Sequence, residues 1–450
     1  MAAAPSVRDV RAHTSRPQDP PPTHRAGAPV LKSAANIVHD PLELDSEFAE
    51  CCIYKVPKQL RKVNEEANTP KVVSIGPFHH NGFGLSDMEN HKKKYLEHFV
   101  NRTGKSKKDL QEIIEANEKK IRRCYAKTFD RIKRKDFVEM ILLDAIFIIE
   151  LFLKTFIKEP DYILSKPWLV NYLLYDLILL ENQLPFFVLE KLYMFAFNDF
   201  SGCNHCGEGK QIEEHKKDLK KEDAPFVTLS RKYFSHFDQR KHSIIGEEVK
   251  HLTDLLRYLF CSVPELIQKR RKHMVNLYGA TKLDYARLKF EAIHERRLLD
   301  ITFCNKRSIL AVPQLVIDDN TEVVFRNLIA LEQCHYPSKP YICNYVSLMN
   351  YIINTEQDVK LLVEKDVIVN HIGSNAKVAT LFSELCIQML VTQSCYGSLS
   401  VEIDGYCKNF WNRSMASIKG TFFRDFGRSI ATVGAIIALL SLLINSFRTK

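Results

Sequence analysis

Four acidic residues stand inside otherwise apolar stretches of the first half of the chain. They are Asp144, Glu150, Asp176 and Glu181. A buried carboxylate is costly without a partner, so each should meet a hydrogen-bond donor or a cation, or stay neutral. Paired carboxylates with raised pKa values can perform acid–base catalysis. A polar network that fixes helix packing explains these acids equally well, and no nucleophile accompanies them. We favour the network and keep an enzyme that uses these acids as the alternative.

Metal-ligand spacing occurs at two places. Cys203 and Cys206 have the spacing of zinc ligands, and His215 is the nearby candidate for completing such a site. A closed zinc site needs four ligands, and no second Cys/His pair follows at a suitable interval, which favours an exposed loop. His79 and His80 lack an acidic neighbour in the sequence, which favours a structural role through hydrogen bonds. We predict no metal and no cofactor.

The common catalytic signatures fail on inspection. The triplet Gly104-Lys105-Ser106 resembles the end of a phosphate-binding loop, but Phe99 stands where that loop needs glycine. The pair His294-Glu295 is followed by Leu298, where a zinc protease needs a second histidine. The sequence also lacks the G-x-S-x-G turn of serine hydrolases. We therefore predict no catalytic residues and a protein that is not an enzyme.

Positive charge is concentrated in one region. The chain has 450 residues and a net charge of +10, and residues 92–135 alone hold 16 Lys/Arg against six Asp/Glu. A surface of this kind attracts anionic partners. No recognised nucleic-acid module accompanies it, which argues against nucleic acid. We predict contact with anionic lipid, to which each cation near a membrane surface adds about 1 kcal/mol.

Helical periodicity dominates the elements that must position these residues. Leu110, Ile114 and Ile121 lie on one stripe of an amphipathic helix, whose other face is mostly charged. More apolar helices are predicted over Phe137–Leu153, Leu169–Leu180 and Pro185–Phe197. Their acids recur too often for membrane spans, so we expect them inside a large helical core.

Short β elements are predicted beside further helices. Cys51–Val56 and Lys71–Ile75 are β-prone runs, and Leu299–Phe303 with Ser308–Val312 have the alternation of a hairpin around Cys304–Arg307. Helical spacing returns in Thr321–Gln333, Ile342–Thr355 and Val378–Thr392. The fold class is therefore predicted as mainly α, a large helical domain over residues 48–415 with small β-hairpin elements.

The ends and one insertion differ in composition from this domain. Residues 1–40 are rich in proline and predicted to be disordered, and a charged insertion covers about 201–225. Ser429–Phe447 has no charged residue and as a helix would reach roughly 28 Å, enough for a single C-terminal transmembrane anchor. We expect a protein of the plasma membrane or an endomembrane, with the main domain and its reduced cysteines in the cytosol.

Several longer strings carry a family resemblance. They are Cys51–Pro57, Pro70–His80, Met88-Glu89 with His91-Lys92, Phe137–Met140, Asp176–Phe187, Leu299–Ile301, Asn327–Cys334 and Asp358-Val359. Together they resemble the plant-specific "domain of unknown function 247" family, from about Phe48 to the C-terminus. The resemblance implies no agreed enzymatic activity and a hydrophobic C-terminal helix. Some grass members are linked to pollen self-incompatibility, which implies recognition of other proteins.

Three positions depart from the family pattern. Ala145, Arg287 and Asp366 stand where the family has glycine. Glycine permits a positive φ, so replacing it should strain a turn unless Asp366 tolerates the left-handed region. The whole sequence therefore predicts a non-enzymatic, membrane-anchored plant protein that acts through protein contacts.

Overall fold

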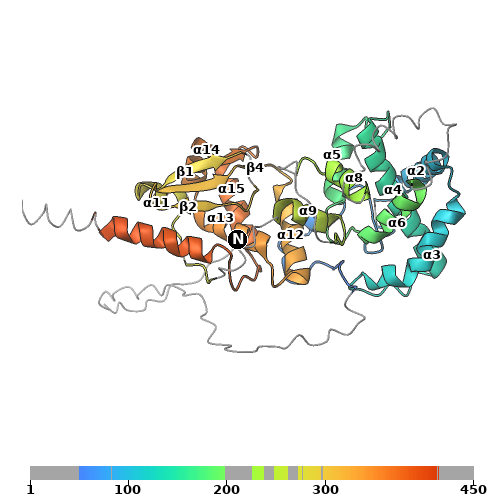
Figure 1. Ribbon diagram of the computed structural model, residues 1–450, viewed down its shortest axis with the longest axis horizontal. Helices are drawn as coiled ribbons and strands as arrows, with labels where there is room; N and C mark the ends of the chain where they lie inside the picture. The colour runs from blue at the N-terminus through green and yellow to red at the C-terminus, as the bar shows by residue number, and fades with distance from the viewer. Residues whose placement is uncertain are drawn as a thin grey trace, which may run out of the picture. The chain divides into compact units, whose positions relative to one another are not determined.

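The structure of the chain is a computed structural model that describes residues 50–82, 84–197, 225–237, 248–261, 272–275, 277–294, 297–412 and 414. Helices predominate in these residues, and two small sheets lie in the second half (Figure 1). The first half contains α1 (Lys58–Arg61), η1 (Glu66–Asn68), α2 (Asp87–Thr103), α3 (Lys107–Arg123), α4 (Arg134–Ile157), α5 (Pro167–Asp176), α6 (Phe186–Phe197), α8 (Pro225–Tyr233) and α9 (Leu252–Cys261).

Helix α4 lies at the centre of the first half. Helices α2, α3, α6 and α8 all pack against it, and every residue from Met140 to Lys154 is buried. A helix covered on all sides must be apolar all round, which explains its composition and confirms the prediction over Phe137–Leu153. It ends at Ile157, and the C-cap residue Lys158 takes a left-handed conformation with φ 55°.

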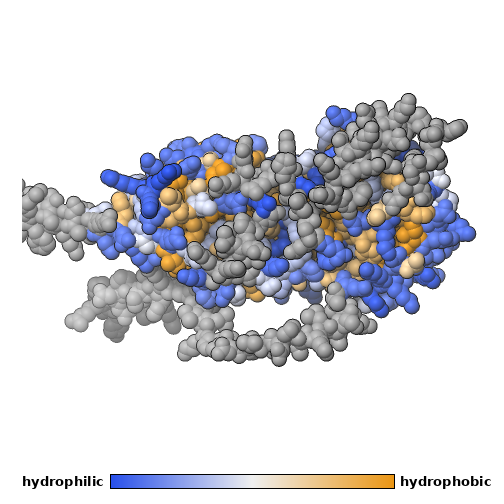
Figure 2. Space-filling view, in the orientation of Figure 1, coloured by the Kyte–Doolittle hydropathy of each residue, from blue (hydrophilic) through white to orange (hydrophobic). Residues whose placement is uncertain are grey.

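Helix α3 has the predicted amphipathic character. Leu110, Ile114 and Ile121 are fully buried, whereas the cations along the outer face are mostly exposed. Its N-terminus is closed by a capping box between Ser106 and Asp109. Figure 2 shows the hydrophilic surface at the outer edge of this helix.

The second half combines helices with two sheets. It contains α11 (Ala280–Tyr285), β1 (Lys289–Ile293), β2 (Thr302–Cys304), β3 (Ile309–Pro313), β4 (Leu315–Ile317), α12 (Thr321–His335), α13 (Tyr341–Ile352), α14 (Glu356–Glu364), β5 (Ile368–Asn370) and α15 (Asn375–Leu385). A further helix covers 397–412. One sheet has the order β1-β3-β2, and the other pairs β4 with β5.

The predicted hairpin is confirmed. Strands β2 and β3 are antiparallel, with Phe303 opposite Leu310 and Cys304 opposite Ile309. The parallel pairs β1–β3 and β4–β5 were not predicted. Each joins strands that are distant in the sequence, so no local turn signals the pairing.

The two β-prone runs of the N-terminal region form no strand, so that prediction is wrong. Among the described residues, Ile53 makes one isolated bridge to Tyr125, and Lys71–Ile75 has no strand partner. Helix α5 also differs from its prediction, because it ends at Asp176 and not at Leu180. The polar side chains of residues 176–183 account for Lys71–Ile75 and for the end of α5, whereas Cys52 and Ile53 bond the backbone carbonyl of Cys124.

Two of the three positions where the family has glycine adopt a positive φ. Arg287 and Asp366 have φ values of 63° and 58°, each directly after a helix. The N–H of Leu288 bonds the carbonyl of Leu283, and that of Val367 bonds the carbonyl of Leu362. These are Schellman ends, where glycine is usual because it carries no Cβ. Arg287 and Asp366 therefore both take the left-handed conformation, which Asp tolerates better than most residues, whereas Ala145 is buried within α4.

The fold class needs one correction. A transmembrane helix was predicted, but none of the helices in the described ranges is both long and apolar enough to cross a membrane. Ser429–Phe447, on which that prediction rested, lies outside the described residues. The same holds for residues 1–40, for the insertion 201–225 apart from its last residue, and for Cys203, Cys206 and His215. The corrected fold class is a mainly helical domain with two small sheets.

Candidate functional site

A loop of buried polar residues follows α5. This anchoring loop, residues 176–183, carries four polar side chains that are at most 3% exposed: Asp176, Glu181, Asn182 and Gln183. The leucine and isoleucine residues between them are also buried, so the loop is held in the core from both sides. Its polar groups all need partners in this position. Most of those partners come from the N-terminal segment, which we define as residues 51–80.

Asp176 and Asn182 hold the middle of the N-terminal segment. The carboxylate of Asp176 accepts hydrogen bonds from the backbone N–H groups of Lys71, Val72 and Val73, at 2.8–3.1 Å. The amide of Asn182 accepts from the N–H of Ile75 at 2.7 Å and donates to the carbonyl of Val73 at 3.0 Å. These side chains take the place of a neighbouring strand. The run therefore has hydrogen-bond partners in side chains and belongs to no sheet.

Asp144 fixes the turn that follows. Lys92 donates from Nζ to Asp144 Oδ1, to Glu89 Oε1 and to the carbonyl of Ser74, each at 2.6 Å. The second oxygen of Asp144 accepts from the N–H of Gly76 at 2.8 Å. Gly76 has φ 69°, and a Cβ there would lie 2.6 Å from the carbonyl oxygen of Gln183. Only glycine fits this close approach.

Glu181 joins both ends of the N-terminal segment. It accepts from the N–H of Val56 at 2.8 Å and from Arg61 at 3.0 Å, and His79 Nε2 lies 3.3 Å from its other oxygen. His79 thus has an acidic neighbour that sequence proximity did not reveal. His80 is half-buried in the turn after it.

Glu150 belongs to a different network. Arg102 bonds both oxygens of Glu150, at 2.9–3.2 Å, and also contacts Glu159. Lys154 lies 2.7 Å from Glu159 and 3.5 Å from Asp161. This cluster joins α2 to the end of α4. The four predicted acids therefore all have the partners that burial requires, but the structure brings only three of them to one segment.

Burial controls the charge of these groups. It raises the pKa of Asp176 to about 6, although the N–H groups of Lys71, Val73 and Val72 oppose the shift. Burial lowers the pKa of Lys92, but the attraction of Asp144 and Glu89 outweighs it, so the net shift is upward and the ammonium stays charged. The carboxylates are committed to these structural bonds, and the two cavities described below are not lined by Asp144, Asp176 or Glu181.

Three further buried residues, which the sequence did not single out, also connect separate segments through hydrogen bonds. His251 is held between the carbonyl of Cys52 and the N–H of Asp254, at 3.1 and 3.3 Å. Glu332 accepts from Arg257 Nε at 2.9 Å and from two backbone N–H groups at the start of α13. Asp358 accepts from Thr281 and ties α11 to α14. Glu332 and Asp358 lie within strings of the family resemblance, which was the available signal, whereas His251 carried none.

An aromatic patch lies on the surface next to this core. Tyr162, Trp168 and Tyr172 are exposed by 62%, 59% and 38%, and define the patch. The rings of Trp168 and Tyr172 meet edge to face at 6.2 Å, and His91 stacks on Tyr162 at 5.4 Å. A surface pocket of about 780 Å³ adjoins Tyr162, between the end of α4 and the start of α5. Exposed aromatic rings gathered in this way are unusual on a free surface.

The basic region 92–135 contains both buried and exposed cations. Lys92 is buried in the core, but most of the other cations lie exposed on α2, α3 and the start of α4. Some are paired with acids, as Lys107 is with Glu139 at 3.0 Å. The predicted contact of this region with anionic lipid stays a prediction.

A family model described as plant protein of unknown function, DUF247, matches residues 53–441. The chain belongs to this family. The match contains the anchoring loop and nearly all of the N-terminal segment, so the earlier resemblance is confirmed.

Two relatives from Arabidopsis thaliana match over most of their length. The UPF0481 protein At3g47200 is 29% identical over 429 residues, which cover 88% of this chain and 85% of the relative. The UPF0481 protein At3g02645 is 22% identical over an alignment of 485 residues, which covers 90% of this chain and 91% of the relative. No solved structure matches the chain.

Proposed function

We propose that this protein is a recognition protein that binds an acidic segment of a partner protein through the aromatic patch. The observation that carries the proposal is the exposure of Trp168 and Tyr172, whose rings meet edge to face, together with the exposed Tyr162 shortly before them in the chain. Tryptophan and tyrosine are the residues most enriched among those that dominate binding energy at protein interfaces.

Buried side chains and hydrogen bonds keep the backbone of the patch ordered, which suits it to binding. Leu169 and Leu173 on α5 are buried, and they fix the turn that presents Trp168 and Tyr172. On the other side, Asp161 accepts from the hydroxyl of Tyr95 at 2.7 Å and from the N–H of Ile163 at 2.8 Å. A surface that is already ordered loses little conformational entropy on binding.

The charges around the patch favour an acidic partner. Lys71 lies 5.5 Å from the ring of Tyr172 and Lys166 5.7 Å from the ring of Tyr162. Lys158 is exposed at the rim of the adjoining pocket. The nearby acids Glu159 and Asp161 are engaged by Arg102 and Lys154. The lysines therefore set the sign of the surface, and electrostatic complementarity would steer acidic chains to it.

Trp168 gives a direct test of this proposal. The chain has two tryptophans, so a Trp411→Phe variant leaves Trp168 as the sole indole reporter. We expect its fluorescence to change in a saturable way when a copolymer of glutamate and tyrosine is added to the full chain, and not with polylysine. The combined substitutions Lys158→Ala and Lys166→Ala should weaken that binding by about tenfold.

Tyr285 provides the matched control. It is 74% exposed and lies away from the patch, at the end of α11. Tyr285→Ala should leave binding unchanged, whereas Tyr172→Ala should weaken it. An equal response of Trp168 to heparin or to anionic vesicles would overturn the proposal, because it would indicate a general affinity for polyanions. No saturable response to the copolymer would also overturn it.

A further inference from the structure

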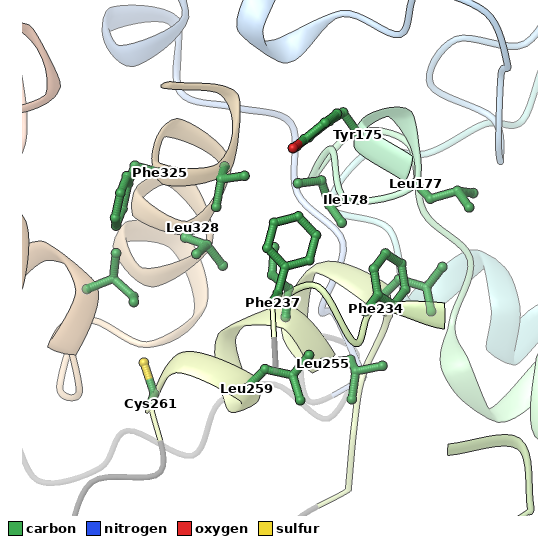
Figure 3. Close-up of a cluster of buried hydrophobic side chains, with 14 of the residues drawn as sticks. Tyr175, Leu177, Ile178, Phe234, Phe237, Leu255, Leu259, Cys261, Phe325 and Leu328 are labelled. Carbon is green, nitrogen blue, oxygen red and sulfur yellow. The ribbon is translucent and has the colours of Figure 1, made fainter. Parts of the chain in front are cut away.

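A second cavity lies where the first half of the chain meets the second. It has a volume of about 140 Å³. One wall comes from Tyr175 on α5, Phe237 in the turn after α8, and Phe260 on α9. The other wall comes from β4 and α12, through Leu315, Val324 and Phe325. Figure 3 shows Phe237 and Phe325 on the elements that face each other here.

The size of this cavity suits a single aromatic ring. Tyr175, Leu315, Val324 and Phe325 are buried, so the space is lined by apolar groups that the fold holds in place. An engineered cavity of about 150 Å³ with leucine, isoleucine and phenylalanine walls in another protein stays dry and binds benzene. Apolar cavities with a few placed polar groups are the usual form of small-molecule sites.

The polar groups of the cavity are Asp318, Tyr175, Thr321 and His236. Asp318 Oδ1 accepts from the N–H of Asn320 at 3.0 Å and from the hydroxyl of Thr321 at 2.9 Å, which orients its carboxylate. Among the described residues its other oxygen, Oδ2, accepts no hydrogen bond within the chain. Burial raises the pKa of Tyr175 to about 12, so its hydroxyl stays protonated. In Figure 3 that hydroxyl points towards the side of α12.

We propose that this cavity binds a small single-ring aromatic compound that carries a hydroxyl or amino donor and no acidic group. The ring fills the space between Phe237, Phe260 and Phe325, and its donor bonds the carboxylate of Asp318. The same carboxylate repels an acidic substituent, which gives the site its selectivity. A hydrogen bond to a charged acceptor is the stronger kind and also fixes the orientation of the ligand.

Calorimetric titration of the full chain with four ring compounds tests the proposal. The probes are p-cresol, aniline, benzoate and cyclohexanol. We expect p-cresol and aniline to bind, benzoate to bind at least about tenfold more weakly, and cyclohexanol to bind weakly because it lacks the flat ring. Benzoate that binds as tightly as p-cresol would overturn the role of Asp318. No binding of p-cresol or aniline at millimolar concentration would overturn the site itself.

Two variants locate the binding. Val324→Phe fills the cavity and should abolish p-cresol binding. Asp318→Asn keeps an acceptor oxygen but removes the charge, so it should weaken p-cresol by about tenfold and remove the discrimination against benzoate. The neighbouring exposed acid gives the matched control, since Asp319→Asn should change neither result. If Val324→Phe does not fold, Asp318→Asn alone decides, because unchanged selectivity in that variant contradicts the proposal.

Discussion

The backbones of the N-terminal segment and of the small sheets are held in two different ways. In the sheets, β1, β2 and β3 bond one another through their backbones. In the N-terminal segment, Cys52 and Ile53 bond the backbone of residues 124–126, whereas Val56 and residues 71–76 bond the side chains of Asp176, Asn182, Asp144 and Glu181. A backbone ladder is indifferent to most substitutions, because every residue supplies the same groups. Where side chains supply the hydrogen-bond acceptors, the same bonds depend on a few atoms that a single substitution can remove.

This difference also sets how the two regions respond to pH. Backbone amides of a sheet do not titrate in the working pH range, whereas an imidazole titrates near neutral pH and burial can shift the pKa of a carboxylate towards it. Asp176, Lys92 and His251 all hold the N-terminal segment through titratable atoms. We therefore expect single substitutions and mild acid to act mainly on the attachment of this segment. The predictions below test that expectation, from the largest effect to the smallest.

The largest effect is expected from Lys92→Met. It leaves Asp144 buried at 1% exposure without its cation, and breaking one side of a buried ion pair costs about 4 kcal/mol. Urea denaturation followed by circular dichroism measures the loss. Lys93→Met, at the exposed neighbouring position, should change stability by less than about 0.5 kcal/mol.

A double variant shows whether the loss of stability comes from the broken ion pair or from the substitution at position 92 itself. Lys92→Met with Asp144→Leu removes both charges, so it should be less destabilised than Lys92→Met alone. Equal stability of Lys92→Met and Lys93→Met would contradict the burial of this pair.

Asp176→Ala should have the next largest effect. It leaves the N–H groups of Lys71, Val72 and Val73 without their acceptor, which we expect to cost about 3 kcal/mol. The measurement belongs at about pH 7.5, above the pKa of about 6, where the carboxylate is charged. Glu291→Ala, at an exposed acid of β1, is the matched change in a sheet and should cost less than about 0.5 kcal/mol. Similar losses in the two variants would refute the proposed contrast.

Much of the helical framework could be predicted from the sequence, because its signals are local. Helix α12 was expected over Thr321–Gln333 and covers Thr321–His335. The turns at Arg287 and Asp366 were also located, since a missing glycine identifies a position that needs a positive φ. The β-prone run Lys71–Ile75 was predicted as a β element but forms no strand, because its N–H groups bond Asp176 and Asn182. Its partner, Asp176, lies in another part of the chain, and no local pattern shows which acid meets which N–H group.

The candidate binding surfaces were harder to predict for a related reason. The apolar composition of Leu169–Leu180 predicts a buried helix, and Leu169 and Leu173 are indeed buried. Trp168 and Tyr172 directly precede these leucines, lie on the adjacent face of the same turns and are exposed. Hydrophobicity alone cannot distinguish an interface ring from a core ring. Which side of α5 is covered depends on how the helix packs, which is a tertiary property.

The third prediction concerns pH and His251. The Nδ1 atom of His251 lies 3.3 Å from the backbone N–H of Asp254, so Nδ1 accepts and the proton sits on Nε2, which donates to the carbonyl of Cys52. Burial, with His335 as a second cause, lowers the pKa of His251 from 6.5 to about 3. The folded state therefore keeps the ring neutral in a range where the unfolded chain binds a proton. Its contribution to stability is complete above pH 6.5 and falls as the pH drops towards 3.

Comparison of the wild-type chain with His251→Gln isolates this contribution. Between about pH 6.5 and pH 5, the wild-type chain should lose about 2 kcal/mol relative to the variant, because the variant has no ring to protonate. Urea midpoints measured across this range give the difference directly. The raised pKa of Asp176 acts in the opposite direction in both proteins and cancels in the comparison. Parallel stability curves would show that His251 is not held neutral.

The smallest effect is expected in the second half of the chain. It tests backbone strain at a turn, whereas the predictions above test titratable side chains. Arg287 is exposed and has φ 63°, a conformation that costs a residue with a Cβ about 1 kcal/mol relative to glycine. Arg287→Gly should therefore stabilise the chain by somewhat less than that amount, because glycine also gains freedom in the unfolded state. Arg287→Ala keeps the Cβ and removes the charge, so it should give no gain. A stabilisation by alanine equal to that by glycine would assign the effect to the arginine side chain, and the Schellman turn before β1 would then carry no measurable strain.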